Sequence, residues 1–183
     1  MATRYNPSGS VSFDLVRGRV DCGGDHVLVP ADALVDLCRS AGDEAVSDFG
    51  RRLGTAAGRR VADRLGDTSS AALEEVLEHL GGELALLGLG SLGLERWGRA
   101  LVLTVDGGPF GSQLDRLLGA VLEGALQRAF GRDVHAAKLM REDRQVRFLI
   151  ASAAGVGKVS EWLGAGLSYG DVLTRLQQSA GAA

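Results

Sequence analysis

Residues 114–150 read LDRLLGAVLEGALQRAFGRDVHAAKLMREDRQVRFLI, and the spacing of their apolar side chains changes along this stretch. From Leu114 to Phe130 apolar residues recur every three or four positions, which is the period of one helix face. After Gly131 they alternate with polar residues on both sides of a charged turn at 141–144, which is typical of two paired strands. The stretch therefore predicts one long helix followed by an antiparallel strand pair.

The rest of the chain supplies a hairpin, more helices and a second strand pair. Turn residues at 21–25 separate two strand-like runs, and Pro30 is suited to open a helix. The fold class is therefore α+β, a single domain with an N-terminal β-hairpin and a helical layer packed on an antiparallel twisted sheet. We expect a flexible arm at 1–10, the domain at 11–178 and a flexible tail at 179–183. The expected strands are 11–16, 26–29, 92–97, 100–105, 134–140 and 146–150; the expected helices are 30–42, 43–65, 71–86, 114–130 and two short ones within 159–178.

The composition indicates an ordinary folded protein. Of the 183 residues, 45% are hydrophobic and 23% are charged, which suits one domain with its own core. The net charge of -3 lacks the basic excess that neutralises phosphates, so we exclude general nucleic-acid binding. Two cysteines cannot form a disulfide framework, and no segment has the apolar length of a signal peptide or membrane span. We therefore expect a cytoplasmic protein.

A row of glycines marks the expected helix at 43–65. Gly50, Gly54 and Gly58 are spaced four apart, on one face. Each glycine weakens a helix by roughly 1 kcal/mol relative to alanine, so such a row indicates that another backbone packs close against this face.

Several motifs along residues 25–152 occur in the order seen in four-vinyl-reductase-type domains, which this chain resembles. They are FGRRLG at 49–54, LGLG at 87–90, GAVLEGAL at 119–126, GRDV at 131–134 and VRFLI at 146–150. The resemblance implies a small fold that binds ligands or partners, shared with subunits of the transport protein particle that tethers vesicles. No cluster of residues offers acid–base or hydride chemistry, so we expect a non-enzymatic protein without a cofactor.

One departure from the resembled family concerns metal binding. Several of its members hold zinc with a glutamate and cysteines that flank the last hairpin. Here His135, Lys138 and Val146 stand at those places, and lysine and valine are not zinc ligands. We therefore expect no metal.

Other motifs have plainer explanations. The run at 88–93 matches a dinucleotide fingerprint in letters, but a strand follows it where that motif needs a helix. The run at 155–158 lacks two residues of a phosphate-binding loop and is interpreted as a loop or helix entry. Cys22 and His26 lie around a turn without a third residue to orient the base. Cys38 lies on an apolar helix stripe, so it is either a small buried hydrophobe or, as transport-particle relatives suggest, a site of acylation.

Two functions from different classes remain open. The first is a non-enzymatic, dimerising interaction module that acts as a scaffold or regulatory adaptor for a protein partner or a second copy. The second is a sensor domain that binds a small apolar molecule or acyl chain in an internal pocket. The faces expected for helix packing or dimer contact carry Gly50, Gly54, Gly58, Leu117, Val121 and Gly124. The residues expected to line a pocket are Cys38, Leu118, Leu122, Phe130, Phe148 and Trp162.

Overall fold

The computed structural model describes residues 11–14, 16–21, 25–66, 71–97 and 100–180. The expected arm at 1–10 lies outside these residues, as does most of the expected tail. The helices of the described part are α1 (Ala31–Ala41), α2 (Asp43–Leu65), α3 (Leu73–Leu86), α4 (Asp115–Phe130), α5 (Ala153–Gly164) and α6 (Tyr169–Ala180), with a single 3-10 turn, η1 (Ser112–Leu114). The strands are β1 (Ser12–Asp14), β2 (Arg19–Asp21), β3 (Asp25–His26), β4 (Ser91–Trp97), β5 (Ala100–Asp106), β6 (His135–Glu142) and β7 (Gln145–Ala151).

A four-stranded sheet forms the centre of the fold. Its strand order is β4-β5-β7-β6, and each neighbouring pair is antiparallel. The two central strands are buried on both faces, because consecutive side chains of a strand point to opposite sides. Leu103 of β5 pairs with Phe148 of β7 on the inner face, and the next pair, Val102 with Leu149, lies on the outer face.

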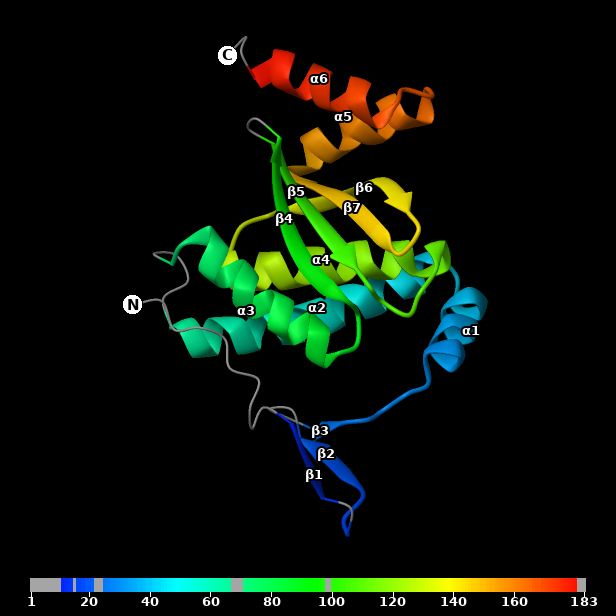
Figure 1. The fold of residues 1–183 in the computed structure, drawn as a ribbon, viewed down its shortest axis with the longest axis vertical. Helices are drawn as coiled ribbons and strands as arrows, with labels where there is room; N and C mark the ends of the chain where they lie inside the picture. Colours follow the sequence, from blue (N-terminus) through cyan, green and yellow to red (C-terminus); the bar gives the residue numbers. More distant parts are fainter. Residues whose placement is uncertain (1–10, 15, 22–24, 67–70, 98–99, 181–183) are drawn as a thin grey trace.

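Helices cover both faces of this sheet (Figure 1). On the inner face α3 and α4 contact the strands, and α2 packs against both helices. On the outer face lie α5 and α6, which contact β5, β6 and β7. Each face has its own hydrophobic cluster, and the inner cluster is the larger. The expected α+β class, with a helical layer on an antiparallel sheet, is confirmed.

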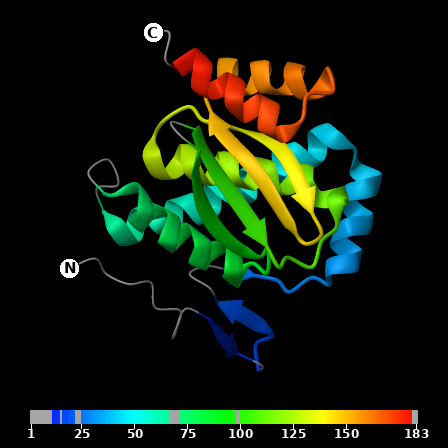
Figure 2. The ribbon, with the colours of Figure 1, turned by 45° about the horizontal axis from the view of Figure 1, so that its top comes forward.

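The amino-terminal strands form a separate small sheet. In Figures 1 and 2 it stands away from the helices and the central sheet. Its order is β1-β2-β3 rather than the expected two strands, because the chain already turns at Gly18, whose φ is 64°. The second expected strand is therefore shortened to Asp25 and His26, and the apolar residues that follow it are exposed.

Two helices, α3 and α5, begin at other residues than expected. The helix α5 begins at Ala153, six positions before the expected start, because the Ser152 side chain accepts a hydrogen bond from Gly155 N–H at 3.4 Å. The helix α3 begins at Leu73, two residues after the expected start, and continues through Gly81 to the expected end at Leu86. The early start of α5 arises from a local capping contact rather than from apolar periodicity.

Within the described ranges, no helix combines the length and the apolar character that crossing a membrane requires.

Candidate functional site

The glycine row of α2 lies against α4 of the same chain. A Cβ at Gly54 would lie 2.0 Å from Val121 O, and one at Gly58 would lie 2.3 Å from Ala125 O. From the other side, a Cβ at Gly124 would lie 2.2 Å from Arg51 O. The two helices thus meet backbone to backbone, which we call the α2–α4 seam.

Of the two expectations for these residues, helix packing or dimer contact, the seam matches helix packing within one chain. Gly50 packs against Leu117 and Ala120 of α4, and all three are buried. Val121 is 1% exposed. Because these faces are covered within one chain, no second molecule can use them without opening the core.

The six residues expected to line one pocket are distributed over different places. Leu118 and Leu122 belong to the closed inner core, while Trp162 lies on the outer face of the sheet. Phe130 borders one cavity, and Cys38 and Phe148 border another. Four of the six are buried, Phe130 and Trp162 are half-buried, and the structure does not bring all six to one cavity.

The apolar cleft that Phe130 borders lies at one end of the inner layer, with a volume of about 370 Å³. It is formed where α3 begins, α4 ends and the middle strands β5 and β7 pass. Leu101 and Ile150 are register partners on these strands, and both face the cleft. Its described lining consists of seven apolar residues and one cation: Ala71, Leu73, Leu101, Leu126, Phe130, Val134, Ile150 and Arg132.

The cavity bordered by Cys38 and Phe148 is larger, about 870 Å³, and polar. At its wall Asp115, which is 4% exposed, lies between two cations. Lys138 Nζ is 2.6 Å from Asp115 Oδ2, and Arg141 Nε donates to Oδ1 at 2.8 Å. Arg116 Nη2 lies 2.9 Å from Asp43 Oδ2. These charges already pair with one another, so the cavity offers no unpaired charge of this set to a ligand.

Cys38 itself is a poor nucleophile in this position. It is 8% exposed on α1, and burial raises the pKa of its thiol. Since the thiolate is the reactive form, the thiol at neutral pH behaves as a small apolar side chain. Acylation of Cys38 stays a hypothesis that no contact here favours.

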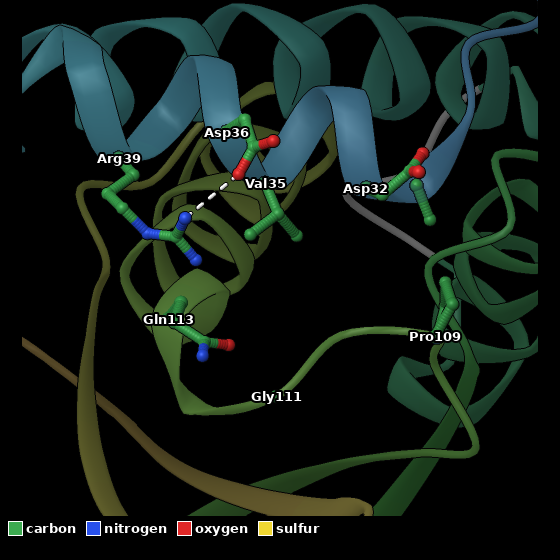
Figure 3. Close-up of a pocket in the computed structure, with 8 residues that line it drawn as sticks. Asp32, Val35, Asp36, Arg39, Pro109, Gly111 and Gln113 are labelled. Atoms are coloured by element: carbon green, nitrogen blue, oxygen red, sulfur yellow. Dashed lines mark hydrogen bonds and ion pairs between the residues drawn. The ribbon is translucent and has the colours of Figure 1, made fainter.

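A third hollow, of about 570 Å³, lies between α1 and the loop that leads to η1 (Figure 3). On α1, Arg39 Nη1 and Asp36 Oδ1 pair at 2.8 Å, and Gln113 and Pro109 lie across the groove. Asp32, Asp36 and Arg39 are all exposed. The groove is therefore an open polar surface rather than an enclosed site.

The inner layer also contains a buried ion cluster that the sequence did not single out. Glu83 of α3 is 1% exposed. Arg60 Nε and Arg64 Nη1 of α2 lie 2.5 Å from its two carboxylate oxygens. Because both oxygens are occupied by arginines of the neighbouring helix, the cluster joins α2 to α3.

The three positions that replace the resembled zinc ligands have other contacts. Val146 is 0% exposed in the inner core, and Lys138 is paired with Asp115. His135 Nε2 lies 3.2 Å from Asp133 Oδ1. In the part of the chain that the structure describes, no group of three or more His, Cys, Asp or Glu residues could hold a metal ion.

The remaining motifs adopt ordinary local structures. The run at 88–93 forms a turn and the start of β4, so no helix faces a pyrophosphate there. The run at 155–158 lies in the first turns of α5. Cys22 lies outside the described residues, and His26 ends β3.

Comparison with known proteins relates the fold to a ligand-binding domain. No family model and no curated protein matches the chain. Among solved structures, the phenol-responsive sensory domain of the transcription activator PoxR, with phenol, matches with a TM-score of 0.58 at 13% sequence identity. The match covers 78% of this chain and 85% of that chain. At this identity the likeness shows the fold alone.

Proposed function

We propose that this chain is a sensory domain that binds a small apolar molecule in the apolar cleft. The observation that carries the proposal is the cleft itself, about 370 Å³ and lined by seven apolar side chains and one arginine among the described residues. Binding sites for small molecules commonly have volumes of about 300–1,000 Å³, apolar walls and few polar groups. The proposed role is binding rather than catalysis.

Two further observations support a sensory role. The structural neighbour is the phenol-responsive sensory domain of a transcription activator, and it shares this fold. The order of motifs along residues 25–152 also supports placing the chain beside four-vinyl-reductase-type domains, which include ligand-sensing members. A panel of small apolar molecules tests the proposal.

Filling the cleft should abolish binding. Ala71 is half-buried in the lining, so Ala71→Phe places a ring where the ligand would lie. We expect phenol, indole or toluene to raise the melting temperature of the wild type. A ligand present at 100 times its Kd raises the free energy of unfolding by about 2.7 kcal/mol, and the variant should lose the corresponding rise in melting temperature. Thermal denaturation with and without each compound measures this rise.

A matched control separates cleft filling from the mere addition of a ring. Ala56 is exposed on α2 and does not border the cleft, so Ala56→Phe should keep the ligand-induced shift. The proposal is wrong if no compound of a broad apolar panel stabilises the wild type, or if Ala71→Phe binds as the wild type does.

A dimerising interaction module is the second candidate, and the amino-terminal segment favours it. Val27 and Leu28 are 83% and 75% exposed, beside the small sheet that stands away from the body. Exposed neighbouring apolar side chains are typical of contact surfaces. Any self-association would therefore use this segment rather than the α2–α4 seam.

Polar substitutions in this segment should weaken self-association. We expect the double variant Val27→Ser, Leu28→Ser to sediment as a monomer at concentrations where the wild type forms dimers. The control is Leu37→Ser on α1, where an exposed leucine also becomes polar. Analytical ultracentrifugation over a concentration series gives the answer, and a wild type that stays monomeric throughout would remove this candidate.

A further inference from the structure

The rim of the apolar cleft carries a cation, Arg132, for which the described part of the chain supplies no counter-ion. Arg132 follows Gly131, whose φ of 63° ends α4 and turns the chain toward β6. Its side chain lines the cleft and is exposed. Within the described ranges, Arg132 makes no ion pair or hydrogen bond.

Two acidic residues, the sequence neighbour Asp133 and Glu74 close in sequence to the lining residue Leu73, have other partners. Asp133 lies 3.2 Å from His135 Nε2, and Glu74, in the first turn of α3, pairs with Arg96. No carboxylate is found among the described residues that line the cleft. Arg132 therefore lines an apolar cleft, and its side-chain hydrogen-bond donors have no partner among the residues that the structure describes.

We propose that the ligand of this cleft is a small apolar molecule that bears a carboxylate, and that Arg132 binds this group. The inference rests on the proposed function and deepens it by naming the ligand class. The apolar part of such a molecule would contact Phe130, Leu101 and Ile150 inside the cleft. Its carboxylate would remain at the rim, where a guanidinium can donate two parallel hydrogen bonds to it.

The chemistry distinguishes this class from a neutral phenol or alcohol. A neutral hydroxyl gains one ordinary hydrogen bond at the rim, whereas a carboxylate gains charge-assisted bonds that are roughly twice as strong. Because Arg132 is exposed, water and salt screen part of this gain. We therefore expect a moderate preference for the anion that declines as salt is added.

Benzoate and benzyl alcohol test this inference, because they share a ring and differ in charge. Calorimetric titration of the full chain at neutral pH and low salt should give benzoate about tenfold tighter binding than benzyl alcohol. Arg132→Gln should remove most of this difference and leave benzyl alcohol unaffected. Arg132→Lys should retain part of the preference for benzoate, since lysine keeps the positive charge but lacks the planar guanidinium that donates two parallel hydrogen bonds.

Arg128→Gln is the matched control. Arg128 is exposed near the end of the same helix and does not line the cleft, so the variant lowers the net charge equally and should bind both probes normally. The inference is overturned if benzyl alcohol binds as well as benzoate, or if Arg132→Gln weakens both probes alike. It is also overturned if Ala71→Phe leaves benzoate binding intact, or if benzoate does not bind while neutral compounds of the panel do. That last result would leave the sensory function standing, whereas the absence of every ligand would remove both.

Discussion

Gly54→Ala lowers the free energy of unfolding by about 3 kcal/mol, the largest effect that we expect from adding one methyl group to this protein. The new Cβ would lie 2.0 Å from Val121 O and 2.8 Å from the Val121 carbonyl carbon. Both are backbone atoms of a buried helix, so no flexible side chain can move aside. The helices α2 and α4 must separate, and the inner core loses contacts along the seam. Urea denaturation followed by circular dichroism measures the change.

Gly157→Ala is the control for this experiment. Gly157 lies inside α5, and apart from its chain neighbours and its own helix backbone no heavy atom of the described residues lies within 4 Å of the position of its added Cβ. Alanine is the better helix former, so this variant should be more stable than the wild type by up to about 1 kcal/mol. Equal effects of the two substitutions would contradict the close approach of α2 and α4.

Glu83→Ala should lower the free energy of unfolding by about 2–3 kcal/mol, because charge-assisted hydrogen bonds between α2 and α3 are lost. The substitution leaves Arg60 and Arg64 beside a buried position without their shared carboxylate. The Arg60 and Arg64 side chains are 16% and 34% exposed, so water takes over part of the lost contacts, but the link between α2 and α3 is removed and the buried space of Glu83 is emptied. Chemical denaturation of the purified variant should show an earlier midpoint with an unchanged slope.

The same helix supplies the comparison. Glu74 of α3 pairs with Arg96, but both side chains are 61% exposed. Glu74→Ala should therefore cost less than about 1 kcal/mol. If Glu83→Ala is as mild as Glu74→Ala, the cluster between α2 and α3 does not hold these helices together.

Apolar periodicity predicted the helices and the central strands because it depends on the local contrast between buried and exposed faces. The glycines at 50, 54 and 58 also correctly indicated a close backbone neighbour. Their spacing did not identify that neighbour, because a face of small residues fits a helix of the same chain or of another. Only the tertiary structure shows that the partner is α4.

The apolar cleft was not predictable in the same way. Its lining comes from the start of α3, the end of α4 and the middle strands, which are far apart in the sequence. Phe130 was expected at a pocket because it is a large apolar residue, but Ala71 and Arg132 carry no such signal. Glu83 was missed for a related reason, since a glutamate in a charged helix is usually exposed and only the two arginines of α2 explain its burial.

Both faces of the central sheet are formed by the same strands, because consecutive side chains of β5 and β7 point to opposite faces. Leu101 and Ile150 pair across β5 and β7 and face the apolar cleft. The adjoining pair, Val102 and Leu149, packs in the outer cluster with α5 and α6. If a ligand shifted these strands, the outer face on which α5 and α6 pack would move with them, because the two pairs are adjacent residues of the same strands.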